Sequence, residues 1–182
     1  MRRTKPINIA LVVTSLSLLG CQTNTLNQPD GSGAILFPIE FEFTNTSKHP
    51  CSRISFDFGN TSEEFRISVT ENKSGSFTGI GLLTNIQPGS YHIDKFRCYA
   101  HKGRIFNGSS SYLEMDADLK VNIEENRVLA TRYTLTGHNT KKFNNETSFK
   151  AEFVNFGSDA QDNAIATFTE TPLPTGWSII RD

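Results

Sequence analysis

From residue 34 onward, apolar and polar residues alternate over one short stretch of the chain after another. Side chains of a β-strand point alternately to its two faces, so this period of two predicts strands with one buried and one solvated face. A chain built from such strands must cover every apolar face, which constrains its fold more than any other feature here. In ILFPIEFEFTN (35–45), the apolar residues Phe37, Ile39, Phe41 and Phe43 would face one way, and Glu40 and Glu42 would face the other.

The same alternation predicts about seven further strands. The parity of the apolar residues changes between Ile93 and Phe96, which predicts a β-bulge near Asp94. The glycines of 76–83 predict a bulge or a close approach of two backbones. The predicted segments are RISFDFGN (53–60), EEFRISVTEN (63–72), 76–83, YHIDKFRCYA (91–100), SYLEMDADLKVNI (111–123), RVLATRYTLTG (127–137) and SFKAEFVNF (148–156).

About eight strands that are each apolar on one face require two sheets packed face to face, or one small closed barrel. We therefore predict an all-β fold, an antiparallel two-sheet β-sandwich, with a small β-barrel as the alternative. The chain has 182 residues and shows no internal repeat or second linker, so residues 34–182 are predicted to form one domain.

The segment after residue 157 breaks the alternation. Ser158 to Gln161 has the form of a helix capping box, and Pro172 ends the run that follows. This pattern predicts one short C-terminal helix, with a strand as the alternative. The residues that recur at helical spacing are Ala160, Ala164, Ile165 and Phe168.

A Pro-Gly turn joins two of the predicted strands in LTNIQPGSYHIDKF (83–96), where Tyr91 follows the turn. This segment resembles a corner in the immunoglobulin- and prealbumin-like sandwich modules of cell-surface and envelope proteins. Modules of this kind mostly bind other molecules or hold them apart. The resemblance implies a sandwich fold and a binding or spacing role.

The N-terminus has the composition of a secretory signal peptide, with three basic residues before an uncharged stretch from Ile7 to Leu19. That stretch is shorter than the roughly 20 apolar residues of a membrane-spanning helix. Leu18-Leu19-Gly20-Cys21 resembles the lipobox of bacterial lipoproteins. The resemblance implies removal of residues 1–20, attachment of a diacylglycerol to the Cys21 sulfur, and acylation of the Cys21 amino group with a fatty acid such as palmitate.

Two or three acyl chains hold a protein firmly on a membrane, whereas one chain binds only marginally. Gln22, rather than aspartate, follows Cys21. In enteric-type bacteria, the lipoprotein sorting rule then implies a lipid-anchored, periplasm-facing position at the outer membrane.

Residues 22–33 are polar and contain Pro29. We therefore expect 21–33 to be a lipidated cysteine with a flexible tether, which would reach about 20 Å.

Assigning Cys21 to lipid leaves Cys51 and Cys98 as a pair in an oxidising compartment. We predict a disulfide between them, with two reduced, buried thiols as the alternative. A bridge across this separation would stabilise the fold by about 4 kcal/mol on the chain-entropy estimate.

The histidines His49, His92, His101 and His138 form no HxH or HxxxH pair, so no metal site is predicted. His92 and Asp94 share a predicted strand face, with Ser109–Ser111 as nearby hydroxyls, but no GxSxG motif is present. A second group comprises Glu114, Asp116 and Asp118, whose two aspartates would lie about 7 Å apart. Paired carboxylates serve in glycoside hydrolysis or bind calcium, and they also occur on ordinary solvated strand faces. We predict no catalytic residues, no metal and no cofactor.

The formal net charge is −1, and it becomes −4 without residues 1–20, which excludes a basic footprint for nucleic acid. The leading hypothesis is a non-enzymatic lipoprotein that contacts an envelope protein or a polymer such as peptidoglycan. One alternative is an envelope hydrolase or carbohydrate-binding protein acting through His92 or through Asp116 and Asp118. The other alternative is a carrier with an apolar ligand in its interior.

Overall fold

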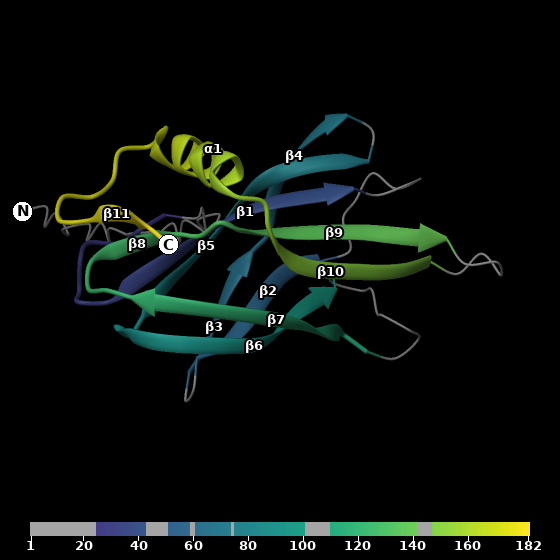
Figure 1. The fold of residues 1–182 in the computed structure, drawn as a ribbon, viewed down its shortest axis with the longest axis horizontal. Helices are drawn as coiled ribbons and strands as arrows, with labels where there is room; N and C mark the ends of the chain where they lie inside the picture. The colour runs from purple at the N-terminus through teal and green to yellow at the C-terminus, as the bar shows by residue number, and fades with distance from the viewer. Residues whose placement is uncertain (1–24, 43–50, 59–60, 74, 101–109, 142–146) are drawn as a thin grey trace, which may run out of the picture.

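The computed structural model describes residues 25–42, 51–58, 61–73, 75–100, 110–141 and 147–182. The described strands form two sheets that pack face to face, which confirms the predicted β-sandwich (Figure 1). They form two separate sheets rather than one closed sheet. The small sheet has the order β3 (Thr61–Arg66), β2 (Cys51–Phe58), β6 (Gly89–Ala100) and β7 (Tyr112–Ile123).

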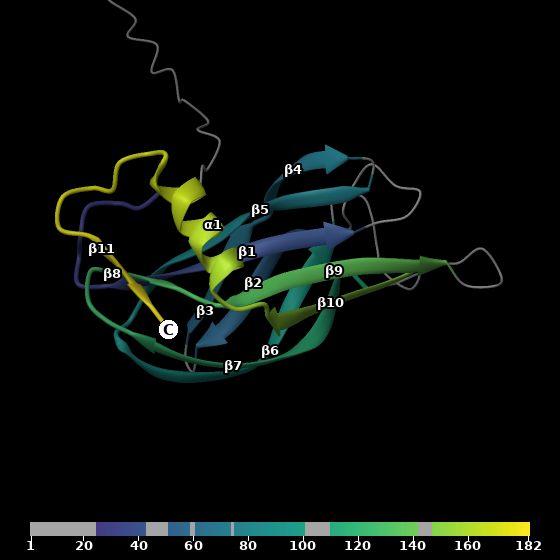
Figure 2. The ribbon, with the colours of Figure 1, turned by 45° about the horizontal axis from the view of Figure 1, so that its top comes forward.

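The large sheet has β1 (Gly33–Glu42) near its centre. Helix α1 (Ser158–Thr169) lies across one end of this sheet, as the two views in Figures 1 and 2 show. The order of the sheet is β10 (Thr147–Asn155), β9 (Tyr133–Lys141), β1, β5 (Ser76–Ile86) and β4 (Ser68–Lys73), with β8 (Arg127–Ala130) beside β1 and β11 (Ser178–Arg181) beside β8.

The sandwich is mainly, but not wholly, antiparallel. β1 pairs in parallel with β8 and β9, and β8 pairs in parallel with β11. The reason is topological, because the chain passes through the small sheet and then re-enters the large sheet beside β1 in the same direction. The alternation of apolar and polar residues within a strand does not show whether a neighbouring strand runs parallel or antiparallel to it.

Aromatic rings fill the space between the sheets. Phe56 on the small sheet is 1% exposed and stacks on Phe37 of β1, with 5.5 Å between the ring centroids. Phe65, Phe96 and Phe153 surround this pair. The apolar faces of the two sheets therefore contribute their aromatic side chains to one shared core.

The structure has more strands than the alternation predicted. The single strand expected at 63–72 is two strands, because the chain leaves the small sheet after β3 and enters the large sheet at β4. Ile67 lies at this crossing and donates its backbone N–H to the Ser52 carbonyl at 3.1 Å. Phe65, Ile67 and Val69 all pack on the same core, so the apolar period continues through the change of sheet. The strand β11 was not predicted either.

The strand expected at 127–137 is also two strands, β8 and β9. Neither has a register partner for Phe37 or Pro38 of β1. Proline has no backbone N–H, so a continuous neighbour could not be fully paired along this part of β1. At the break, Thr131 donates its backbone N–H to the Leu36 carbonyl at 3.0 Å.

The predicted bulge near Asp94 is confirmed. The register of β6 and β7 shifts between Ile93 and Lys95, so that Asp94 faces two residues of β7, Ala117 and Asp118. At 76–83 the close contact is with a side chain rather than with a second backbone, because a Cβ at Gly81 would lie 2.5 Å from the Phe65 ring. The Pro-Gly turn carries the chain from β5 to β6 in the other sheet, and Tyr91 Oη donates to the Gln87 carbonyl across it at 2.7 Å.

Helix α1 confirms the predicted helix, but the capping box is wrong. Gly157 occupies the N-cap position, and no side chain caps the helix. Gln161 is instead 3% exposed, and its Nε2 donates to the Ala130 carbonyl at 2.7 Å and to Asp182 Oδ1 at 3.1 Å. Burial of the helix on β1, β5 and β8 turns Gln161 inward, where it satisfies groups at the end of β8.

Replacing Gln161 with alanine is therefore expected to lower the free energy of unfolding by about 2 kcal/mol, because buried acceptors lose their donor. Ser158→Ala is the matched control and is expected to change stability by less than about 0.5 kcal/mol. Urea unfolding followed by circular dichroism measures both. A larger loss of unfolding free energy in Ser158→Ala than in Gln161→Ala would support the capping-box interpretation instead.

The first described residues pack against the domain, unlike the flexible tether predicted for 22–33. Leu26 is 9% exposed and joins the apolar cluster beneath α1. Trp177 Nε1 donates to the Asn27 carbonyl at 2.9 Å, and the Gly31 N–H donates to Asn126 Oδ1 at 3.1 Å. From Leu26 onward the chain therefore belongs to the folded domain, and the tether prediction fails for this part because Leu26 has an apolar site to occupy.

Candidate functional site

The outer face of the large sheet divides into a covered and an open part along β1. Ala34 and Leu36 point outward beneath α1 and belong to its apolar cluster. Glu40 and Glu42 point the same way but are exposed. The open part forms a groove lined by Glu40, Phe41, Glu42, Ser76, Phe77, Thr78, Thr136, Gly137, His138, Glu152, Val154 and Phe156. We call it the sheet groove.

Strand register places the polar residues of the sheet groove in two rows across the sheet. The two rows lie two residues apart along β1, which is about 7 Å. The first row is Thr78, Glu40, Thr136 and Glu152. The second is Ser76, Glu42 and His138, which Lys150 continues beyond the groove lining.

The sheet groove is acidic and has an apolar rim. Lys150 Nζ pairs with Glu152 Oε2 at 2.7 Å. Among the described residues, no hydrogen bond or ion pair engages the carboxylates of Glu40 and Glu42. Phe156 is 51% exposed, and Phe156 and Tyr112 are the exposed large hydrophobic residues of the described chain. The sheet groove thus offers two carboxylates beside an accessible ring.

The outer face of the small sheet is also charged, but its charges pair with one another. Arg97 contacts Asp57 at 2.9 Å and Glu114 at 3.2 Å, and Lys95 Nζ donates to Glu114 Oε1 at 2.9 Å. The hydrogen bond from Lys95 lowers the pKa of the Glu114 carboxyl. The Arg53 guanidinium group lies over the nearby Tyr99 ring, 4.1 Å from the ring centroid. The Lys95 and Arg97 cations of this face thus already have anionic partners, whereas Glu40 and Glu42 of the sheet groove have none among the described residues.

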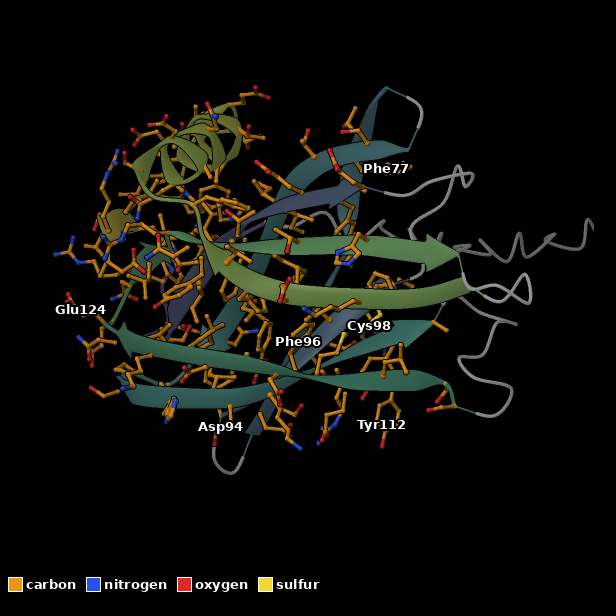
Figure 3. All side chains as sticks on the ribbon, turned by 45° about the vertical axis from the view of Figure 1, so that its right-hand side comes forward. Phe77, Asp94, Phe96, Cys98, Tyr112 and Glu124 are labelled. Carbon is orange, nitrogen blue, oxygen red and sulfur yellow. A yellow bond between two sulfur atoms is a disulfide. The ribbon has the colours of Figure 1, made fainter. Side chains whose placement is uncertain are left out.

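The predicted pair, His92 and Asp94, lies on this same outer face at the β6–β7 bulge, where Figure 3 labels Asp94. His92 Nε2 is 2.9 Å from Asp118 Oδ1 and 3.5 Å from Asp94 Oδ1. Asp118 has a φ of +47°, a conformation that the bulge imposes on a non-glycine residue. Asp116 stands opposite Lys95 rather than His92. The contacts of His92 with Asp94 and Asp118 therefore stabilise the bulge in β7. β7 is an edge strand of the small sheet, and a bulge hinders the pairing of an edge strand with other chains.

The hydrogen bond from His92 lowers the pKa of the Asp118 carboxyl below its ordinary value. A carboxyl whose pKa is lower in the folded state stabilises the fold above its unfolded pKa of about 4, and this contribution is lost as the pH falls through the folded value. We therefore expect the difference in melting temperature between the wild type and Asp118→Asn to shrink between pH 6 and pH 2. A difference that grows as the pH falls would contradict the assignment.

Ser110 and Ser111 are the described members of the predicted hydroxyl group. The Ser110 hydroxyl binds the backbone of Tyr112 rather than His92, and the Ser111 carbonyl accepts from the Ala100 N–H. His49, His101 and Ser109 lie outside the described residues. His92 and His138 lie on different sheets. Within the described ranges, no group of three or more histidine, cysteine, aspartate or glutamate residues could hold a metal ion.

The predicted disulfide between Cys51 and Cys98 is present, with 5.4 Å between the two Cα atoms. It joins the start of β2 to the end of β6 within the small sheet, and both cysteines are fully buried. Cys21 lies outside the described residues. Across the described part of the chain, no helix is long and apolar enough to cross a membrane.

Comparison with family models, curated proteins and solved structures finds no match to this chain. The candidate site therefore depends on geometry alone. Sequence reasoning missed the sheet groove, although it placed Glu40 and Glu42 on the wet face of their strand. A usable signal was the change along 34–42, where residues of both parities are apolar up to Pro38 and only one parity is apolar afterwards.

Proposed function

We propose that this chain is a non-enzymatic binding lipoprotein of the bacterial envelope. Its lipid on Cys21 holds it at the outer membrane, on the periplasmic side, and the sheet groove contacts an envelope protein or polymer. The observation that carries the proposal is the division of the outer face of the large sheet. One end is sealed by α1 and the first described residues, and the other end is open and polar.

The two ends are well separated along the molecule. Gly31 and Ser32 bond to Asn126, next to the turn that contains Glu124. Glu124 and Phe77, which lines the sheet groove, lie at opposite ends of the domain in Figure 3. The eight-residue step from Ala34 to Glu42 along β1 spans about 27 Å. Leu26 packs in the apolar cluster beneath α1. An anchor that precedes Leu26 would therefore hold the domain by the covered part of the large sheet and leave the sheet groove, beyond that cover, accessible to a partner.

The alternative functions receive less support from the geometry. For a hydrolase, Asp116 and Asp118 would have to act on one bond, but Asp118 is engaged by His92 and Asp116 stands opposite Lys95. For a carrier, the interior would need room for a ligand, whereas the described core contains closely packed phenylalanine rings. The sheet groove provides the more accessible surface.

Cys21→Ala is expected to abolish incorporation of radiolabelled palmitate and to remove the protein from the outer-membrane fraction, because no sulfur remains for the lipid. Gln22→Asp is the matched control. It should keep the label, and in an enteric host it should shift the protein to the inner membrane. Labelling that persists in Cys21→Ala would contradict the lipoprotein assignment.

A photoreactive amino acid placed at His138, an exposed position of the sheet groove, is expected to cross-link to an envelope component in intact cells. The same amino acid at Asn122, which is exposed on the small sheet, serves as the control. Cross-linking at His138 but not at Asn122 supports a partner at the sheet groove. Cross-linking only at Asn122, or at neither position, contradicts it.

A further inference from the structure

The spacing of Glu40 and Glu42, whose carboxylates have no partner among the described residues, narrows the chemistry of the partner that fits the sheet groove. Glu40 and Glu42 alternate with the buried Ile39 and Phe41, so both project from one face of β1. Their spacing along the strand is about 7 Å. Residues i and i+2 of any extended peptide show the same separation on one side, so an extended segment lying along β1 would match this repeat.

The charge of the sheet groove selects basic side chains. Glu40 and Glu42 have no ion-pair partner among the described residues, although His138 stands beside Glu42 in the register, and Lys150, next along that row, is paired with Glu152. Nucleic acid and anionic lipid would be repelled, and a neutral polysaccharide would leave both carboxylates without a counter-charge. Lysine or arginine at alternate positions would place one cation at each of Glu40 and Glu42.

The rim of the sheet groove adds an apolar contact on the side of the helix. Val154 and Phe156 line the groove where β10 leads into α1, and half of the Phe156 surface is exposed. Half-exposed aromatic rings beside polar groups are frequent anchors at protein interfaces. Phe156 lies on the β10 side of the groove, two strands from β1, so an apolar residue of the partner would contact this ring where the segment crosses towards β10 beyond its two basic residues.

We propose that the sheet groove binds an extended, basic segment of a partner protein, with two lysine or arginine residues at positions i and i+2 above Glu42 and Glu40 and an apolar residue against Phe156. This inference rests on the proposed function and names the chemistry of its partner.

The experiment measures fluorescence anisotropy of labelled ten-residue peptides with the full-length protein in non-ionic detergent. The peptides carry two lysines at spacings i+1, i+2 or i+3 in a background of threonine and valine. The i+2 peptides are expected to bind most tightly. Glu40→Gln/Glu42→Gln should weaken their binding about tenfold, as two modest charge contacts imply, and Phe156→Ala should weaken it about threefold.

Glu124→Gln/Glu125→Gln is the matched control, because it removes the same charge from an exposed turn at the opposite end of the domain. It should leave the affinity within about twofold, and melting curves should show that all variants are folded. Absence of saturable binding at every spacing, equal affinity at all spacings, or an equal loss in the control would overturn the proposal. A non-basic component cross-linked at His138 would overturn this inference while leaving the proposed function intact.

Discussion

Phe56→Ala is expected to lower the free energy of unfolding by about 4 kcal/mol, because it removes a large buried ring and leaves a cavity that the core fills only partly. Phe56 is 1% exposed. Its ring centroid lies 5.5 to 6.5 Å from those of five other phenylalanines, namely Phe37, Phe58, Phe65, Phe96 and Phe153.

Phe156→Ala removes the same number of atoms from a half-exposed position and is the matched control for stability. It is expected to cost less than about 1 kcal/mol, because about half of the Phe156 surface already contacts water in the folded state. Chemical denaturation of both variants, followed by circular dichroism, gives the two values. Similar losses in the two variants would show that the ring cluster between the sheets is not the main source of stability.

Replacing both Cys51 and Cys98 with serine is expected to cost about 4 kcal/mol, which corresponds to a fall of about 8–16 °C in melting temperature for a domain of this size. The bridge spans 47 residues of sequence and joins neighbouring strands of the small sheet. Its main effect is on the unfolded chain, which without the bridge gains freedom between β2 and β6.

Differential scanning calorimetry with and without reductant measures this effect. The wild type should lose stability on reduction, whereas the double variant should be insensitive to reductant. Cys21→Ser provides the control for loss of a cysteine outside the bridge. Equal melting temperatures for the oxidised wild type and the double variant would mean that the bridge contributes no net stability.

Much of the fold could be predicted from the sequence, because a strand with one buried face shows alternating apolar and polar residues. Alternating residues such as Ile39 and Phe41 indicated a strand with one buried face, and the change of parity between Ile93 and Phe96 located the bulge. The oxidising compartment inferred from the signal region pointed to the disulfide between Cys51 and Cys98. Each of these features depends on neighbouring residues or on a count of cysteines, both of which can be read along the chain.

The candidate site was less accessible to prediction, because it depends on which strands become neighbours. Glu40 and His138 belong to one groove only because β9 lies beside β1 in parallel. The change of sheet at Ile67 could not be predicted from the sequence, since the apolar alternation continues across it. Gln161 had the right spacing for a capping box, but burial of α1 gave its side chain nearer and buried partners.

What the sequence determined by itself was therefore the class of structure: strands with one buried face, a short helix at the end, and a cysteine pair available for a bridge. Tertiary structure alone decided the order of the strands, the parallel pairing of β1, and the part of the large sheet that α1 leaves open. The physical reason is that side-chain alternation reports burial at each residue, whereas pairing and coverage depend on contacts between segments far apart in the chain.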